Sequence, residues 1–285
     1  MKPRRSSIFA NRASRPCAFT VVELLVAVSV MTIIVFVLYR VFNETQRALR
    51  GNITQVDVLE AGRAAMELMT RELQEMSAAQ LANQTNFYVE LAPTQVTQKL
   101  PVSGTNRTNV LEDFFFLTRR NKEFCGIGYR VINANIGVGT LARFATETNP
   151  ASQLVFTNLS VQFKTNSPRP AINPTNFHRI ADGIIHLRLL AYDANGRPMT
   201  YLSSRTNSNP NVFLFSDRLP QETRLAFTSN ALPAYVELEL GVLEPQTLER
   251  FKSILSSDMA RKFLEERPGN VHLFRQRIPI RTALR

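Results

Sequence analysis

The chain has no tryptophan and only two cysteines, Cys17 and Cys125, among its 285 residues. Two cysteines allow at most one disulfide. The 19 phenylalanines predict a core that is built largely on Phe.

Motifs that are typical of enzymes are also missing. The three histidines, His178, His186 and His272, are far apart in the sequence. There is no His-Glu-x-x-His helix, no Gly-x-Ser-x-Gly turn and no glycine-rich phosphate loop. We therefore predict that the protein is not an enzyme, that it uses no cofactor, and that His186 has a structural role in a strand.

Two acidic turns are the best candidates for a calcium site, but we expect no metal there. Asp182-Gly183 and Asp193-Ala194-Asn195-Gly196 could supply oxygen ligands. Each offers only two or three ligands, and such clusters are usually plain turns. Five positive charges of the net +11 lie in residues 1–18, which leaves 11 − 5 = +6 for the rest of the chain. This surplus is spread without a basic run between aromatic residues, so the sequence does not favour binding to nucleic acid.

The first 18 residues contain no acid and five basic residues, and a long apolar run follows them. From 19 to 39 the chain is apolar apart from three hydroxyl residues and one acid, Glu23. A run of this length can span a bilayer core, and the basic residues ahead of it predict a cytoplasmic N-terminus. A lone carboxylate near the edge of a span is costly, so we expect Glu23 to have a function and a partner.

The segment Ala18-Phe19-Thr20-Val21-Val22-Glu23-Leu24 resembles the prepilin leader of type IV pilins and type II secretion pseudopilins. In those families a membrane peptidase cuts before a Phe, and the new N-terminus reads F-T-x-x-E. The resemblance implies cleavage between Ala18 and Phe19, N-methylation of Phe19 and a role for Glu23 in assembly. The residue before the cut is usually Gly, and Ala18 is the smallest substitute for it.

Other membrane signals fit the N-terminus less well. A secretory signal would need small residues after the apolar run, where Tyr39-Arg40-Val41-Phe42 is bulky. Arg4-Arg5 is a weak match to a twin-arginine signal, and Cys17 precedes the apolar run, which is the wrong order for a lipoprotein anchor. A plain signal anchor in which Glu23 has no role is the remaining alternative. Cleavage before Phe19 would remove Cys17 and leave Cys125 without an intramolecular disulfide partner. Packing, or a metal with oxygen ligands, must then hold the exported domain together.

The apolar run leads into an amphipathic segment. Apolar residues recur there at steps of three, four or seven and predict one helical face, made of Leu49, Ile53, Val56, Leu59, Met66, Met69, Leu73 and Met76. The opposite face is charged, with Arg50, Glu60, Arg63, Glu67, Arg71, Glu72 and Glu75. Proline is absent from 17 to 92, which permits one continuous helix over 19–82. We assign 1–18 to the leader, 19–41 to a transmembrane part and 42–82 to a stalk that packs on its own domain.

The composition and the alternation of apolar residues over 83–285 predict an exported α+β domain in which strands outnumber helices. Alternation and composition predict strands over 89–91, 111–118, 124–133, 154–157, 161–164, 184–192, 199–202, 234–243 and 272–280. The rest of 83–109 is predicted to be a loop or an irregular strand region. One helix begins at Pro245, has its apolar face from Leu248 to Leu264, and ends at Pro268-Gly269. The predicted fold is a long N-terminal transmembrane helix packed on a mostly antiparallel sheet, as in pilins.

Two segments of this domain resemble the J-type minor pseudopilins. Ile180-Ala181-Asp182-Gly183-Ile184 and the strand after it are similar to the central hairpin of that family. Leu232-Pro233-Ala234-Tyr235-Val236-Glu237-Leu238 takes the place of its L-P-x-x-V-x-x-x-L segment, whereas 247–266 is longer than the usual loop. The layout is also similar to the Verru_Chthon cassette prepilin-like proteins.

These resemblances imply a minor pseudopilin or prepilin-like structural subunit of a type II secretion or type IV pilus-like filament. The implied partners are a prepilin peptidase, other pseudopilins or minor pilins that contact the N-terminal helix, and the inner membrane, crossed once with the domain in the periplasm. A membrane-anchored periplasmic binding module with a prepilin-like anchor is the second hypothesis, and an anchored enzyme is the third.

Overall fold

The computed structural model describes residues 20–79, 81–82, 84–100, 105–120, 123–147, 159–165, 177–200, 209–215 and 223–283. The chain divides into two compact units, Met1–Asn52 and Ile53–Arg285. The first contains most of an apolar helix, and the second is a curled, mostly antiparallel sheet with helices. The predicted α+β class is therefore confirmed.

The first unit is dominated by helix α1 (Val21–Gln74), which continues into the second unit. Its part from Val21 to Leu49 is long and apolar enough to cross a membrane. The large apolar side chains between 21 and 42 are 49–78% exposed. A helix that is apolar all round needs lipid or other helices to cover it.

Helix α1 ends at Gln74, earlier than the predicted end near residue 82. Strand pairing replaces the helix at this point. Met76 forms an antiparallel bridge with Thr118, and the backbone N–H of Ser77 donates to the carbonyl of Leu117 at 2.8 Å. The chain therefore leaves the helix to extend the sheet, a long-range interaction that helical periodicity cannot reveal.

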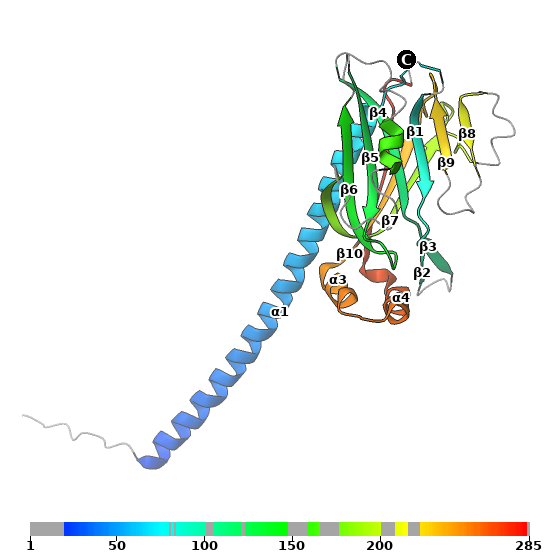
Figure 1. Ribbon diagram of the computed structural model, residues 1–285. Helices are drawn as coiled ribbons and strands as arrows, with labels where there is room; N and C mark the ends of the chain where they lie inside the picture. The colour runs from blue at the N-terminus through cyan, green and yellow to red at the C-terminus, as the bar shows by residue number, and fades with distance from the viewer. Residues whose placement is uncertain are drawn as a thin grey trace, which may run out of the picture. The chain divides into compact units, whose positions relative to one another are not determined.

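The second unit is built on one nine-stranded sheet, in the order β11-β10-β7-β6-β5-β4-β1-β9-β8, in which every neighbouring pair is antiparallel (Figure 1). Its strands are β1 (Thr85–Leu91), β4 (Glu112–Arg120), β5 (Glu123–Ile132), β6 (Gly139–Glu147), β7 (Phe177–Tyr192), β8 (Val212–Leu214), β9 (Thr223–Thr228), β10 (Tyr235–Leu243) and β11 (Val271–Pro279). A separate pair joins β2 (Val96–Lys99) to β3 (Asn106–Asn109).

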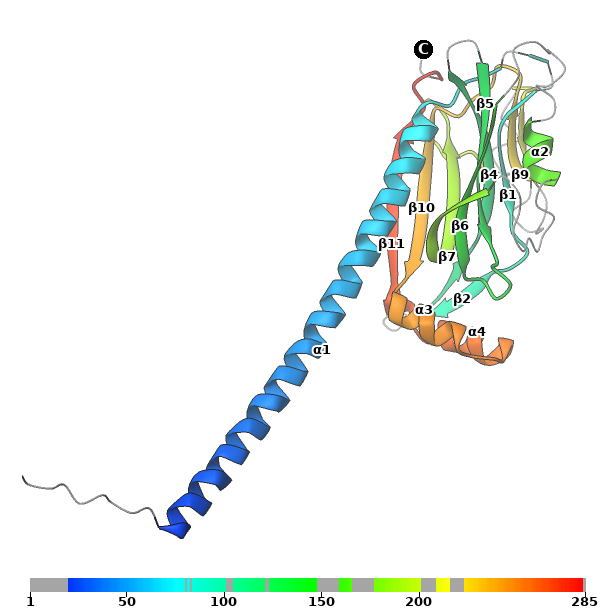
Figure 2. The same cartoon turned by 60° about the vertical axis from the view of Figure 1, so that its left-hand side comes forward.

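The second-unit part of α1 covers one face of this sheet, beside β10 and β11 (Figure 2). Its buried residues include Met66, Met69 and Leu73, which belong to the same core cluster as Phe114 and Phe116 of β4. Successive residues of a strand point to opposite faces, so Phe115 belongs to the core of the other face. The largest fully buried side chains are mostly phenylalanine, which confirms the prediction of a Phe-rich core.

The segment 161–164 is helical, and the predicted strand there is wrong. It belongs to α2 (Leu159–Thr165), whose residues Leu159 and Phe163 lie one helical turn apart and are fully buried. The ring of Phe163 lies 5.9 Å from that of Phe115 and 5.6 Å from that of Phe144. The four-residue spacing of the two large apolar residues decides the structure, rather than the short alternation of apolar and polar positions.

Other predictions of local structure need correction. The region 83–109, predicted as a loop or an irregular strand region with one good strand candidate, contains three strands, β1, β2 and β3, and β6, β8 and β9 were not predicted. The single helix after Pro245 is two helices, α3 (Pro245–Lys252) and α4 (Ser257–Glu265), with Ser256 at the N-cap position of the second. Residues 199–200 are not in a strand, and the predicted strand at 154–157 lies outside the described residues.

The approach of α2 to the sheet requires glycine at position 128. A Cβ atom at Gly128 of β5 would lie 2.4 Å from two ring carbons of the buried Phe163. We expect Gly128→Ala to lower the free energy of unfolding by about 1–3 kcal/mol, because overpacking forces the ring or the strand to move. Gly269→Ala is the control, since nothing lies within 4 Å of its Cβ position. Equal urea midpoints for the two variants would contradict this packing.

Candidate functional site

The amino end of α1 is closed by a reciprocal pair of hydrogen bonds between Thr20 and Glu23. The backbone N–H of Glu23 donates to the Thr20 hydroxyl oxygen at 3.3 Å. The backbone N–H and the hydroxyl of Thr20 donate to Oε2 of Glu23 at 3.2 and 3.1 Å. This is a capping box, in which two backbone N–H groups that the helix leaves unpaired are satisfied. The negative carboxylate also lies in the first turn, where the helix dipole favours it.

Glu23 is the only charged residue between 20 and 39. In the described part of α1, the first basic residue is Arg40, 17 positions further on, which is about 25 Å along the helix axis. The guanidinium of Arg40 instead lies over the ring of Phe36, at 5.6 Å. Among the described residues of α1, therefore, no cation lies close enough along the helix to pair with Glu23. Ala18 and Phe19, the predicted cleavage and methylation positions, lie outside the described residues.

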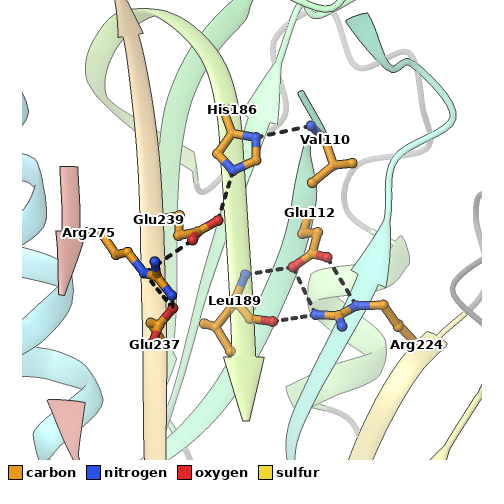
Figure 3. A network of polar contacts seen from close by, with 8 residues as sticks. All are labelled: Val110, Glu112, His186, Leu189, Arg224, Glu237, Glu239 and Arg275. Carbon is orange, nitrogen blue, oxygen red and sulfur yellow. Dashed lines mark hydrogen bonds and ion pairs between the residues drawn. The ribbon is translucent and has the colours of Figure 1, made fainter. Parts of the chain in front are cut away.

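A second polar cluster lies inside the curled sheet, where β7 leaves β6 and meets β4 (Figure 3). Pairing of β7 with β6 stops at Ile184. The backbone N–H of Leu187 then donates to the carbonyl of Val110 at 2.8 Å, and the N–H of Leu189 donates to Oε2 of Glu112 at 2.7 Å. A carboxylate thus takes the place of a neighbouring strand at this edge.

Arg224 of β9 completes this second polar cluster. Its Nε lies 3.0 Å from Oε1 of Glu112, its Nη2 donates to Oε2 at 3.1 Å, and Nη2 also donates to the carbonyl of Leu189. Both side chains are almost fully buried. Burial raises the pKa of Glu112, and the charge of Arg224 together with the Leu189 N–H opposes that rise. The pair satisfies backbone groups that would otherwise be buried without partners, which is a structural role.

His186 has the structural role that the sequence predicts. The backbone N–H of Val110 donates to its Nδ1 at 3.1 Å, so the proton is on Nε2, which lies 3.3 Å from Oε2 of Glu239. This hydrogen bond lowers the pKa of Glu239. Arg275 bridges Glu239 to Glu237 on the same face (Figure 3). The imidazole is therefore held on both sides by neighbours in the sheet.

A buried acid on α1 was missed from the sequence. Glu72 was assigned to the charged outer face, but it is buried against the sheet, where it accepts hydrogen bonds from Tyr129 at 2.5 Å and from Arg143 at 2.8–3.1 Å. Burial and the adjacent Glu72 carboxylate raise the pKa of Tyr129. Its position three residues after Met69 and four before Met76 places it on the buried stripe, a signal that the charge of the side chain masked.

The two acidic turns use their oxygens locally. Asp182 accepts from the Thr140 hydroxyl at 2.6 Å and from Arg179 at 3.1 Å, and the Thr140 hydrogen bond lowers its pKa. Asp193 accepts the backbone N–H of Arg197 at 2.7 Å. Among the described residues, no three His, Cys, Asp or Glu side chains lie together as a metal site would require.

The remaining candidates are far apart. His178 lies opposite Arg143 in the β6–β7 ladder, whereas His272 lies 3.5 Å from Glu244. Cys125 is buried in β5, as predicted, and burial raises the pKa of its thiol. Comparison of the chain with protein-family models, with curated proteins and with solved structures finds no match.

Proposed function

We propose that the chain is a minor pseudopilin or a related prepilin-like subunit of a type II secretion or type IV pilus-like filament. The observation that carries the proposal is Glu23, a lone charge at the amino end of a helix that is long and apolar enough to cross a membrane. Together with the basic leader, it forms the pattern that a prepilin peptidase cuts. The partners are this peptidase and other pseudopilins or minor pilins.

Cleavage between Ala18 and Phe19 creates a positively charged amine on Phe19, which is then methylated. Glu23 has only neutral donors in its capping box, so its charge remains to be balanced. In a low-dielectric surrounding, the amine of a neighbouring subunit offsets much of the cost of burying this carboxylate. The exposed apolar side chains of Val21–Leu49 then pack against the same helices of neighbouring subunits.

The domain supports a structural rather than a catalytic role. Its buried acids are paired with arginines in the described part of the fold: Glu72 with Arg143, Glu112 with Arg224, Asp113 with Arg130 and Glu237 with Arg275. In this proposal the domain lies in the periplasm, the N-terminus enters from the cytoplasm, and the sheet decorates the outside of a bundle of α1 helices.

Leader processing tests the proposal. Co-expression with an active prepilin peptidase is expected to shorten the wild-type chain, and Ala18→Gly is expected to be cut at least as fast. Ala18→Leu is expected to remain uncut, because the position before the cut accepts small residues. Gel mobility with an inactive peptidase provides the control. If Ala18→Gly kept its full length beside an active peptidase, the proposal would be wrong.

A further inference from the structure

The nine-stranded sheet has two edge strands of different length. Strand β8 at one edge has three residues, whereas β11 at the other edge has nine. Strand β11 pairs with β10 over its whole length without a register shift, and among the described residues no strand pairs with its other side (Figure 2). Short strands and bulges are two common ways to protect a sheet edge, and β11 has neither.

Two hydrogen bonds fix which backbone groups of β11 face outward. The N–H of Glu244 donates to the carbonyl of Asn270 at 3.0 Å, and the N–H of Ile280 donates to the carbonyl of Ala234 at 2.9 Å. These bonds flank the ladder in the same register. Because hydrogen-bonded pairs alternate in an antiparallel ladder, the even-numbered residues of β11 bond with β10. The N–H and carbonyl groups of the odd-numbered residues therefore point away from the sheet.

Three of the outward N–H groups have no partner in the described part of the chain, namely those of Leu273, Arg275 and Arg277. The N–H of Val271 differs, since it closes the turn before the strand by donating to the carbonyl of Pro268. Leu273, Arg275 and Arg277 are all exposed. A row of unpaired backbone groups on an exposed strand is a template to which another strand can add.

The side chains beside this edge are positively charged. Arg275 and Arg277 lie on the face of β11 that is opposite to Phe274, whose ring packs against α1. The guanidinium of Arg277 lies over the rings of Tyr192 and Tyr235, at 4.4 and 4.8 Å. The two rings hold Arg277 in place, and no carboxylate among the described residues forms an ion pair with it. Its hydrogen-bond donors are therefore available to an acid on an added strand.

We propose that β11 takes up an extended acidic segment of another protein as an antiparallel tenth strand of the sheet. Residues directly opposite each other in such a pair lie on the same face, so acids two residues apart would meet Arg275 and Arg277. A second copy of β11 does not fit. Full-length antiparallel pairing would place Arg275 opposite Arg275 of the second copy, and like charges destabilise such a pair. The inference does not depend on the proposed function, because it rests on the sheet alone.

Labelled synthetic peptides test this pairing on the detergent-solubilised full chain. One nine-residue peptide alternates glutamate with valine, and a matched peptide alternates lysine with valine. We expect the glutamate peptide to bind about tenfold more tightly in fluorescence anisotropy, because opposite-charge pairs replace like-charge pairs at two positions. Its binding is also expected to slow hydrogen exchange over 273–277. A glutamate peptide that is N-methylated at its glutamates keeps the charge but not the N–H groups that face β11, and is expected not to bind.

Leu273→Pro blocks the edge and leaves the ladder with β10 intact. The N–H of Leu273 faces outward, so proline removes no bond to β10, while its ring occupies the path of the added strand. Leu273→Thr is the matched control, since it also removes the leucine side chain and keeps the N–H. We expect the glutamate peptide to bind Leu273→Thr and not Leu273→Pro, with both variants checked by circular dichroism. If Leu273→Pro fails to fold, the N-methylated peptide still decides.

Three results with the wild-type chain would overturn the proposal: equal binding of the glutamate and lysine peptides, binding of the N-methylated peptide, or no binding of the glutamate peptide at millimolar concentration. The last result would make Arg275, Arg277 and Pro279 the charges and the proline of a protected edge. Exchange over 273–277 that slows as the chain alone is concentrated would also overturn it, because it would assign the edge to a second copy.

Discussion

Glu23→Gln is expected to abolish incorporation of the chain into assemblies while cleavage before Phe19 continues. The glutamine oxygen can still accept the Thr20 hydrogen bonds, so the helix cap is retained. Only the negative charge is lost, which leaves the amine of the neighbouring subunit without its partner. Removing one member of a buried ion pair costs about 3–5 kcal/mol, which corresponds to a loss of assembly of about a hundredfold or more. Cross-linking between α1 helices in membranes, compared with the cleaved fraction, measures both effects.

Thr20→Ala is the matched variant, because it removes the cap and keeps the charge. Loss of a threonine cap costs about 0.5–2 kcal/mol, so helix stability falls a little and assembly is expected to stay close to wild type. The opposite pattern, in which Glu23→Gln assembles normally and Thr20→Ala does not, would make Glu23 a helix cap and nothing more. The pair of variants thus separates the two roles that one carboxylate can have at this position.

Arg224→Met is expected to destabilise the domain strongly, by about 3–5 kcal/mol near neutral pH. The variant leaves the buried Glu112 carboxylate without its charged partner and removes the donor to the Leu189 carbonyl. Urea unfolding of the detergent-solubilised chain measures the loss. Arg275→Met is the control, because its side chain is exposed although it also pairs with two acids, and we expect little change there.

The effect of Arg224→Met depends on pH in a direction that the structure sets. Burial raises the pKa of Glu112 and Arg224 lowers it, so without the arginine the native pKa rises further above the ordinary value of 4.5. The native state then holds a proton that the unfolded state releases. The stability deficit is therefore smallest below pH 4.5 and grows as the pH rises through the native pKa. A double variant with Glu112→Gln should lose this dependence; a deficit that is equal at pH 4 and pH 7 in Arg224→Met would contradict the account.

Some of this fold could be predicted from the sequence because the signals are local. The apolar run with its single acid indicated the helix that contains Val21–Leu49. Clean alternation located the cores of β7 and β10, and the turn after Tyr192 follows from Asp193-Ala194-Asn195-Gly196. Tertiary packing overrode local signals in α2, where two buried residues at helical spacing mattered more than a four-residue alternation.

The polar clusters could be predicted only in part. Glu23 could be identified from the sequence because it is a single charge within an apolar run. Glu112 and Glu72 could not be identified, since their partners Arg224 and Arg143 are 112 and 71 positions away. Glu112 meets Arg224 across the sheet, and Glu72 meets Arg143 where α1 packs on the sheet. No local sequence pattern indicates that β7 stops pairing with β6 at Ile184. Nor does one indicate that the Glu112 carboxylate then accepts the backbone N–H of Leu189.

The N-terminal sequence and intact mass of the membrane-extracted chain test the central claim most directly, in cells with an active and with an inactive prepilin peptidase. The account predicts a chain that begins at Phe19 and is heavier by one methyl group when the peptidase is active, and a chain that keeps residues 1–18 when it is inactive. A chain that still carries Met1–Ala18 beside an active peptidase would contradict the account, and Glu23 would then be the capping residue of a plain membrane anchor.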